Sequence, residues 1–183
     1  MLSCKYADLA ALPQGACVGT SSLRRQAQLL ALRPDLRIES LRGNVDTRLR
    51  KLREGVYDAI ILASAGMNRL GLSAPYMHAL DPQTFLPAVG QGAIGIECRE
   101  DDYDLFALLA EIEDTPTRVC VEAERGFLAG LEGGCQVPIA GHARLEDDET
   151  FVLEGLVAEV DGSQILREAQ RGHTSKARQI GLE

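Results

Sequence analysis

The chain has 183 residues, 45% of them hydrophobic, and a formal net charge of −8. This length allows one large domain or two small ones, and no apolar stretch is long enough to span a membrane. The acidic charge disfavours a nucleic-acid partner. Five scattered cysteines without a C-x-x-C pair argue against a disulfide framework and a structural zinc site, and only three histidines are present. We therefore expect a soluble, cytoplasmic protein without a metal.

The first 70 residues alternate between strand and helix patterns. The helix patterns place apolar side chains every three or four positions. The third strand pattern is a nearly continuous apolar run, typical of a parallel strand covered on both faces. This order predicts an α/β unit with a mostly parallel sheet. We expect strands at 16–20, 37–41 and 57–63, each followed by a helix, at 23–32, 45–55 and 64–70.

Polar residues stand where the first two helices begin. Thr20, Ser21 or Ser22 is suited to cap the first helix, and Asn44 is suited to cap the second. Ligands of parallel sheets bind beyond the carboxyl ends of the strands, where helix N-termini offer N–H groups to anions. The segment 20–53 carries nine basic and three acidic residues, a local charge of +6, in an otherwise acidic chain. This coincidence predicts a site for a small anionic ligand, and solvated helix faces are the alternative.

The second half of the chain changes character. Residues 85–97 are rich in glycine and poor in charge, and they indicate a crossing segment followed by a strand. Helix patterns follow at 103–112 and 116–131, the second with Thr115 as its predicted cap. A small α+β domain is therefore expected from about residue 115. Its predicted elements after the helix are three antiparallel strands at 139–145, 150–159 and 164–170, with a last helix from Gly172.

The segment 133–138, Gly-Gly-Cys-Gln-Val-Pro, presents the thiol of Cys135 on backbone that side chains do not crowd. A thiolate is a nucleophile, although most cysteines are small buried residues. Cys135 follows a predicted helix C-terminus, whose partial negative charge does not lower the pKa of a thiol. Spacing alone leaves both a chemical and a packing role open.

Five blocks, taken in chain order, resemble the porphobilinogen deaminase family, also called hydroxymethylbilane synthase. The blocks are residues 19–25, 41–48, 57–63, 86–99 and 131–138. The resemblance implies a periplasmic-binding-protein-like α/β domain at 1–88, a crossing segment at 89–113 that returns to another domain, and an α+β domain at 114–183 with a three-stranded antiparallel sheet. It also implies that a first domain and a short C-terminal piece of the family lie outside this chain.

In that family the cysteine of the last block carries a dipyrromethane cofactor through a thioether, and here this is Cys135. The enzyme condenses four porphobilinogen molecules onto this primer with loss of ammonia, and then releases the linear tetrapyrrole by hydrolysis, in heme biosynthesis. Arginines hold the many carboxylates, because a planar guanidinium binds a carboxylate with two hydrogen bonds. By position, the resemblance implies a binding set of Thr20, Ser21, Ser22, Arg24, Arg25, Arg42, Gly43, Arg48 and Gln91.

The resemblance places the family's catalytic acid in the first domain, so no catalytic residue is expected in this chain, and the chain alone is expected to be inactive. We further expect a monomer with porphobilinogen as substrate. One alternative is a non-enzymatic module that binds small polycarboxylates and needs no covalent group on Cys135. Another is a nucleic-acid binder using residues 20–53, which the small number of aromatic residues disfavours.

Overall fold

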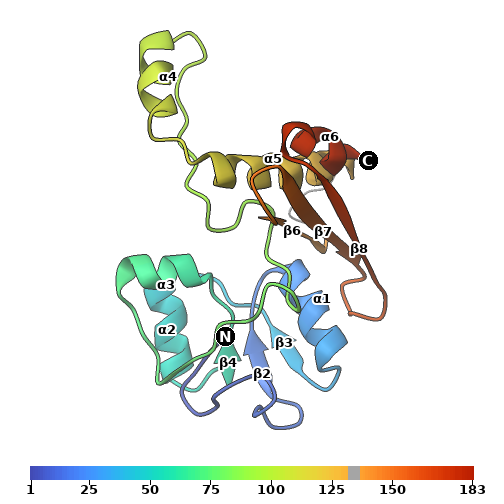
Figure 1. Cartoon of the computed structure of the whole chain (residues 1–183). Coiled ribbons are helices and arrows are strands. Elements are labelled where there is room, and N and C mark those ends of the chain that lie inside the picture. The colour runs from blue at the N-terminus through green and yellow to red at the C-terminus, as the bar shows by residue number, and fades with distance from the viewer. Residues whose placement is uncertain (132–136) are drawn as a thin grey trace. The chain divides into compact units, whose positions relative to one another are not determined.

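The structure is a computed structural model, and it describes residues 1–131 and 137–183. The chain forms two compact units (Figure 1). The first unit consists mainly of Met1–Pro87 and also takes in Leu156–Arg167 and, of the described residues, 137–140. The second unit begins at Ala88 and includes Gly141–Gly155 and Glu168–Glu183.

A five-stranded mixed sheet forms the centre of the first unit, with strand order β3-β2-β4-β1-β5. β2 runs parallel to both β3 and β4, so the three predicted strands are confirmed as parallel neighbours. β1 pairs antiparallel with β4 and with β5, and neither of these two-residue strands was predicted. The strands are β1 Leu2–Ser3, β2 Cys17–Gly19, β3 Arg37–Glu39, β4 Ala59–Ile60 and β5 Tyr76–Met77.

Three helices accompany the parallel strands, and all three were predicted. They are α1 Leu23–Leu32, α2 Val45–Arg53 and α3 Ser64–Leu70. Ser22 caps α1 by accepting from the N–H of Arg25, and Asn44 caps α2 by accepting from the N–H of Thr47 at 2.9 Å. These side chains satisfy N–H groups that have no partner within the helix.

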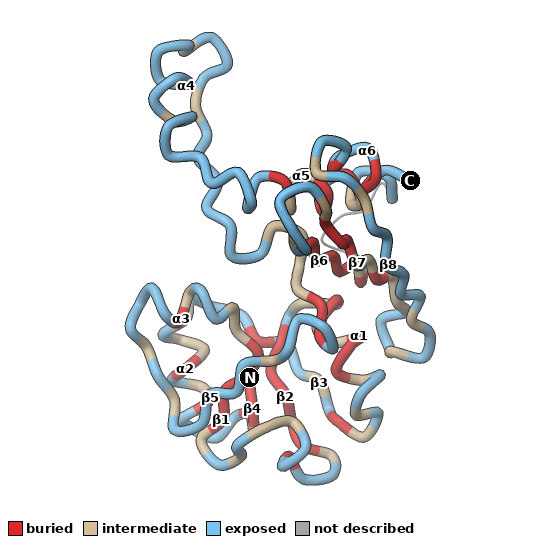
Figure 2. The backbone as a smooth tube through the Cα atoms, viewed as in Figure 1, coloured by how far each residue is buried: buried red, intermediate tan, exposed pale blue. Residues whose placement is uncertain are grey.

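Apolar side chains pack on both faces of this sheet, and Figure 2 shows the backbone of β2 coloured as buried. Successive side chains of a strand point to opposite faces. Ala59 accordingly belongs to the cluster around Val18 and Leu29, whereas Ile60 belongs to the cluster around Leu41. The continuous apolar run at β4 is therefore explained by burial on two faces.

The rest of the chain forms a helical region and a second sheet of three antiparallel strands in the order β6-β7-β8. The boundary between the two compact units crosses this sheet. Val119 and Ala123 of α5 pack on Phe151 and Leu153 of β7. The elements are α4 Tyr103–Ala110, α5 Thr115–Gly130, β6 Ile139–Leu145, β7 Thr150–Ala158, β8 Ile165–His173, a 3-10 turn at Thr174–Lys176 and α6 Ala177–Leu182.

Three local predictions for this region were wrong. Residues 85–97, where a strand was expected after the crossing segment, contain no strand. The cap of α5 is Asp114, whose carboxylate accepts from the N–H of Thr117 at 2.9 Å, and Thr115 is already helical. β8 continues to His173, where a helix was expected from Gly172. Pairing within the sheet carries β8 past the expected start of the last helix, and Asp114 supplies a capping carboxylate one residue before Thr115.

None of the residues of α4 is buried, although the helix carries several large apolar side chains (Figure 2). Phe106 is 60% exposed and Leu108 is 64% exposed. In the preceding segment, Ile94 is 80% exposed. No helix among residues 1–131 and 137–183 has both the length and the apolar character needed to cross a membrane.

Candidate functional site

The carboxyl ends of β2, β3 and β4 meet at one edge of the first sheet. The N–H of Thr20 donates to the carbonyl of Glu39 at 2.9 Å, which holds the ends of β2 and β3 together. Here we call this edge the basic edge, defined by Thr20, Ser21, Ser22, Arg24, Arg25, Arg42, Gly43 and Arg48. The structure gathers these eight predicted residues in one unit, at the ends of two strands and on the helices that follow them.

The three hydroxyl residues organise the turn between β2 and α1. Thr20 is buried, and its hydroxyl oxygen accepts from the N–H of Ser22 at 3.2 Å. The hydroxyl of Ser21 donates to the carbonyl of Leu41 at 2.8 Å and lies 3.1 Å from the hydroxyl of Ser40. Ser21 therefore ties the turn after β2 to the end of β3.

Arg24 and Arg25 lie in the first turn of α1 and reach two different segments. The Nη1 of Arg24 donates to the carbonyl of Leu86 at 2.7 Å, and the Nη1 of Arg25 donates to the carbonyl of Ile61 at 2.9 Å. Burial, together with the charge of Arg25, lowers the pKa of Arg24 to about 10. Burial and the charge of Arg48 lower the pKa of Arg25. The charge of Arg25 thus acts on Arg24, and the charge of Arg48 acts on Arg25, and a nearby anion would favour the charged form of each group.

Arg42 and Arg48 come from the loop after β3 and from α2. Arg42 is exposed, whereas Arg48 is half-buried and its Nε donates to the carbonyl of Gly43 at 2.8 Å. Gly43 has φ of +117°, and a Cβ placed there would lie 2.9 Å from the methyl carbon of Thr47. Glycine is therefore required for this turn, which positions Arg48.

Of the two other predicted site residues, one lies in the second unit and one lies outside the described residues. Gln91 is exposed in a turn of the second unit, where its N–H donates to the carbonyl of Ala88 at 3.0 Å. Cys135 lies outside the residues that the structure describes.

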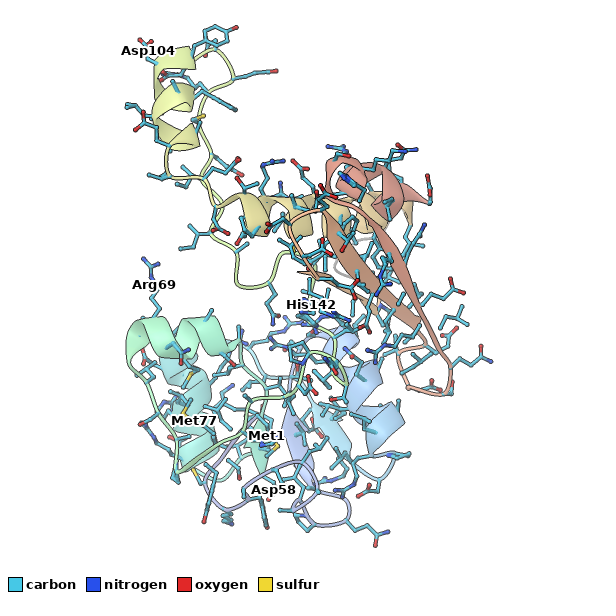
Figure 3. The ribbon with its side chains drawn as sticks, in the orientation of Figure 1. Met1, Asp58, Arg69, Met77, Asp104 and His142 are labelled. Atoms are coloured by element: carbon cyan, nitrogen blue, oxygen red, sulfur yellow. The ribbon has the colours of Figure 1, made fainter. Side chains whose placement is uncertain are left out.

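Asp58 immediately precedes the first residue of β4 and therefore lies at the end of that strand opposite to the basic edge (Figure 3). Its Oδ2 accepts from the N–H of Cys17 at 2.8 Å, and its carbonyl accepts from the hydroxyl of Ser3. Asp58 thus connects three strands and is remote from the carboxyl ends where the arginines lie. Arg69, in the last turn of α3, extends away from the sheet (Figure 3).

Sequence reasoning missed Gln28 and Leu86, which are both buried beside Arg24. The amide of Gln28 is hydrogen-bonded to both backbone groups of Leu86. One available signal was the spacing of Gln28, four residues after Arg24 and therefore on the same helix face. The partner segment lies 58 residues further along the chain, and no local pattern indicates it.

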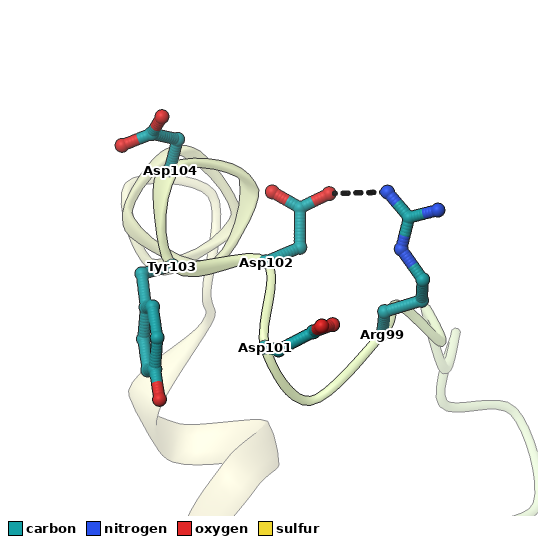
Figure 4. A pocket seen from close by; sticks show the side chains of 5 residues that line it. All are labelled: Arg99, Asp101, Asp102, Tyr103 and Asp104. Carbon is teal, nitrogen blue, oxygen red and sulfur yellow. Dashed lines mark hydrogen bonds and ion pairs between the residues drawn. The ribbon is translucent and has the colours of Figure 1, made fainter.

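A separate open pocket in the second unit is lined by residues at the start of α4 (Figure 4). Arg99 forms an ion pair with Asp102 at 3.3 Å, and two further aspartates and Tyr103 complete the lining. The surplus of carboxylates makes this pocket unsuited to a polycarboxylate ligand. In the part of the chain that the structure describes, no three His, Cys, Asp or Glu side chains are grouped to hold a metal ion.

Comparison with known proteins gives two family matches. A family described as "Porphobilinogen deaminase, dipyromethane cofactor binding domain" matches residues 1–107. A second, "Porphobilinogen deaminase, C-terminal domain", matches residues 118–183.

Similar curated proteins carry the same name. The chain is 66% identical over 186 residues to a porphobilinogen deaminase of Nitratidesulfovibrio vulgaris (strain DSM 19637 / Miyazaki F), covering 100% of this chain and 59% of that protein. It is 57% identical to one of Lawsonia intracellularis, over 99% of this chain and 59% of the relative. It is 56% identical to one of Roseiflexus sp., over 91% of this chain and 54% of that relative. The chain therefore spans less than two thirds of the length of these relatives.

Proposed function

Because the chain belongs to the porphobilinogen deaminase family, we propose that it provides the cofactor-binding part of a hydroxymethylbilane synthase. The proposed reaction condenses four porphobilinogen molecules with loss of ammonia and releases a linear tetrapyrrole by hydrolysis. The comparisons do not support the alternative of a non-enzymatic anion-binding module.

The observation that carries this proposal is the grouping of guanidinium groups at the basic edge. Every pyrrole of the substrate bears an acetate and a propionate, so a chain of linked pyrroles is densely anionic. Arg25 and Arg48 come from two helices yet are close enough for the charge of Arg48 to lower the pKa of Arg25. α1 has no acidic residue in its first turn, so its N-terminus adds to the positive potential.

The donor set of the basic edge fits a dipyrromethane with four carboxylates. We propose that Arg24, Arg25, Arg42 and Arg48 bind these carboxylates, with hydroxyl and N–H groups of Thr20, Ser21, Ser22 and Gly43 as further donors. Cys135 is proposed to hold the group through a thioether, and Gln91 to contact it. When bound, the dipyrromethane supplies the pyrrole carbon to which the first porphobilinogen is joined. We assign no general acid to this chain.

The proposed domain arrangement follows the same family. Residues 1–88 are proposed as the α/β binding domain of periplasmic-binding-protein type, 89–113 as the crossing segment, and 114–183 as the domain with the cofactor cysteine. The exposed apolar side chains of Ile94, Phe106 and Leu108 support a crossing segment that packs against a further part of the protein. We propose a cytoplasmic monomer that binds porphobilinogen and does not bind nucleic acid.

The test is the intact mass of the chain purified from cells that synthesise porphobilinogen. The proposal predicts an increase equal to two linked pyrrole units, located on Cys135 by peptide mapping. Cys135→Ser removes the thiol and should abolish the increase. An unmodified mass for the wild-type chain, also after incubation with porphobilinogen, would contradict the proposal.

A further inference from the structure

Gln28 is an almost fully buried polar side chain in the middle of α1. Only 2% of its surface is exposed. A buried amide is costly unless its donors and acceptor are hydrogen-bonded. Arg24 lies one helical turn before Gln28, so both side chains leave the same face of α1.

The amide of Gln28 pairs with both backbone groups of Leu86. Its Oε1 accepts from the N–H of Leu86 at 2.7 Å, and its Nε2 donates to the carbonyl of Leu86 at 3.0 Å. The same Nε2 lies 3.3 Å from the carbonyl oxygen of Arg24. A side chain here makes the two hydrogen bonds that a neighbouring strand would make. Leu86 is followed by Pro87, which has no N–H to offer in its place.

The side chain of Leu86 is also fixed. It is fully buried and packs with Ala140 and Leu156, which belong to the first unit. The carbonyl of Leu86 therefore has a defined position and direction, set by packing on one side and by Gln28 on the other.

That carbonyl is also the acceptor for Arg24, whose Nη1 lies 2.7 Å away. A carbonyl oxygen has two lone pairs, so it can accept from Gln28 and from Arg24 together. The guanidinium is planar and rigid, so fixing the acceptor of one N–H constrains the plane of the whole group.

We propose that Gln28 is a positioning residue for the basic edge: it locks the Leu86 carbonyl, and this carbonyl orients the guanidinium of Arg24. The identity of the ligand rests on the proposed function. The orientation of Arg24 does not, which allows the two to be tested separately.

The test compares Gln28→Met with Gln26→Met in the full chain. Met has nearly the length of Gln but forms no comparable hydrogen bonds. Gln26 is only half-buried and lies two residues earlier on α1, so it is the matched control. The measurements are the amide hydrogen exchange of Leu86, the side-chain NMR signals of Arg24, and the dissociation constant of porphobilinogen determined by calorimetry.

For Gln28→Met we expect exchange at Leu86 to rise by about tenfold or more, as for the loss of one buried hydrogen bond. The Arg24 signals should shift, and the dissociation constant of porphobilinogen should rise by about tenfold. Gln26→Met should change none of these. Asp35→Asn, which weakens the loop beyond the other end of α1, controls for a general loss of stability and should leave the Arg24 signals in place.

If Gln28→Met does not fold, Gln28→Glu serves instead. It retains an acceptor for the N–H of Leu86 but cannot donate to the carbonyl, and its charge draws the Arg24 guanidinium towards itself. Unchanged Arg24 signals in the variant that folds would overturn the proposal. Shifted Arg24 signals together with a wild-type chain that forms no adduct would support the positioning role and contradict the proposed function.

Discussion

The carboxylate of Glu124 accepts a hydrogen bond from the backbone N–H of Gly90, with 2.6 Å between Oε2 and the nitrogen. The other carboxylate oxygen accepts from the N–H of Ala143 at 2.8 Å. Glu124 is only 6% exposed, and all three residues belong to the second unit. One buried side chain of α5 thus holds both the turn before Gln91 and the strand β6.

Replacing Glu124 by Gln should therefore destabilise the second unit. The amide has only one acceptor oxygen, and its NH₂ group would face a backbone N–H. We expect the free energy of unfolding to fall by about 1–3 kcal/mol, measured by urea denaturation. The control is Glu122→Gln on the same helix, where the exposed pair with Arg118 should contribute less than about 1 kcal/mol. Equal effects of the two substitutions would contradict this account.

Gly162 in the turn between β7 and β8 lies against the backbone of α1. A Cβ at Gly162 would be 2.6 Å from the carbonyl oxygen of Ala27 and from the nitrogen of Ala31. We expect Gly162→Ala to destabilise the first unit by more than the roughly 1 kcal/mol of its positive φ alone, measured by thermal and urea unfolding.

Gly15 is the matched control for Gly162, because both have φ of +72°. A Cβ at Gly15 meets nothing within 4 Å, so Gly15→Ala incurs the backbone strain without the close contact. The difference between the two variants measures the contact with α1. A Gly162→Ala variant as stable as Gly15→Ala would show that the turn does not depend on this contact.

Asp35 should make the stability of the first unit depend on pH in the acid range. Hydrogen bonds from Arg33, and then from the N–H of Gly15, lower the pKa of Asp35 below its ordinary value of 3.8. The folded state therefore holds this proton less tightly than the unfolded state. The stabilisation is fully present above about pH 4 and is lost as the pH falls towards the pKa of the folded state.

Asp35→Asn should lower the melting temperature near neutral pH, because Arg33 and Gly15 lose a charged acceptor. The difference from the wild-type chain should shrink progressively below about pH 4. Melting curves of both proteins between neutral and acid pH provide the measurement. A difference that stays constant over this range would mean that the carboxylate charge is not involved.

Arg48→Met should weaken the binding of porphobilinogen at the basic edge. The substitution removes one guanidinium but retains an apolar side chain of moderate length. We expect the dissociation constant measured by calorimetry to rise by about tenfold or more, as for the loss of a charged hydrogen bond. Arg50→Met is the control on the same helix, because Arg50 is exposed and pairs with Glu54. An equal change in both variants would indicate only a general effect of net charge.

Local sequence patterns were sufficient for the helices and most strands. α1 and α2 have a clear apolar period and side chains that cap them, Ser22 and Asn44, so their limits followed from local chemistry. β1 and β5 are each two residues long. β1 pairs with β4 and with β5, and both partners lie more than 50 residues further along the chain. Such short strands have no period to detect, and only the completed sheet specifies them.

For the candidate site, the sequence predicted where the arginines lie in the fold but not which contacts bury Arg24. The positions of the arginines at the ends of parallel strands followed from the order of strands and helices. The burial of Arg24 did not, because it depends on Leu86 reaching α1 from a distant part of the chain. Gln28 was missed for the same reason, since a glutamine in a helix usually indicates a solvated face.

Burial lowers the pKa of Arg24 and of Arg25, and the charge of a neighbouring arginine adds to the effect in each case, so keeping these two groups charged costs folding free energy. Below about pH 10 the buried guanidinium of Arg24 is charged, and its removal from water lowers the free energy of unfolding. A multivalent anion that binds these groups in the folded state and not in the unfolded state would raise the free energy of unfolding, so anion binding and folding would be thermodynamically linked. Sulfate and phosphate should raise the melting temperature more than chloride at equal ionic strength, and Arg48→Met should reduce that gain. Such a gain would make anion binding a contribution to the stability of this unit.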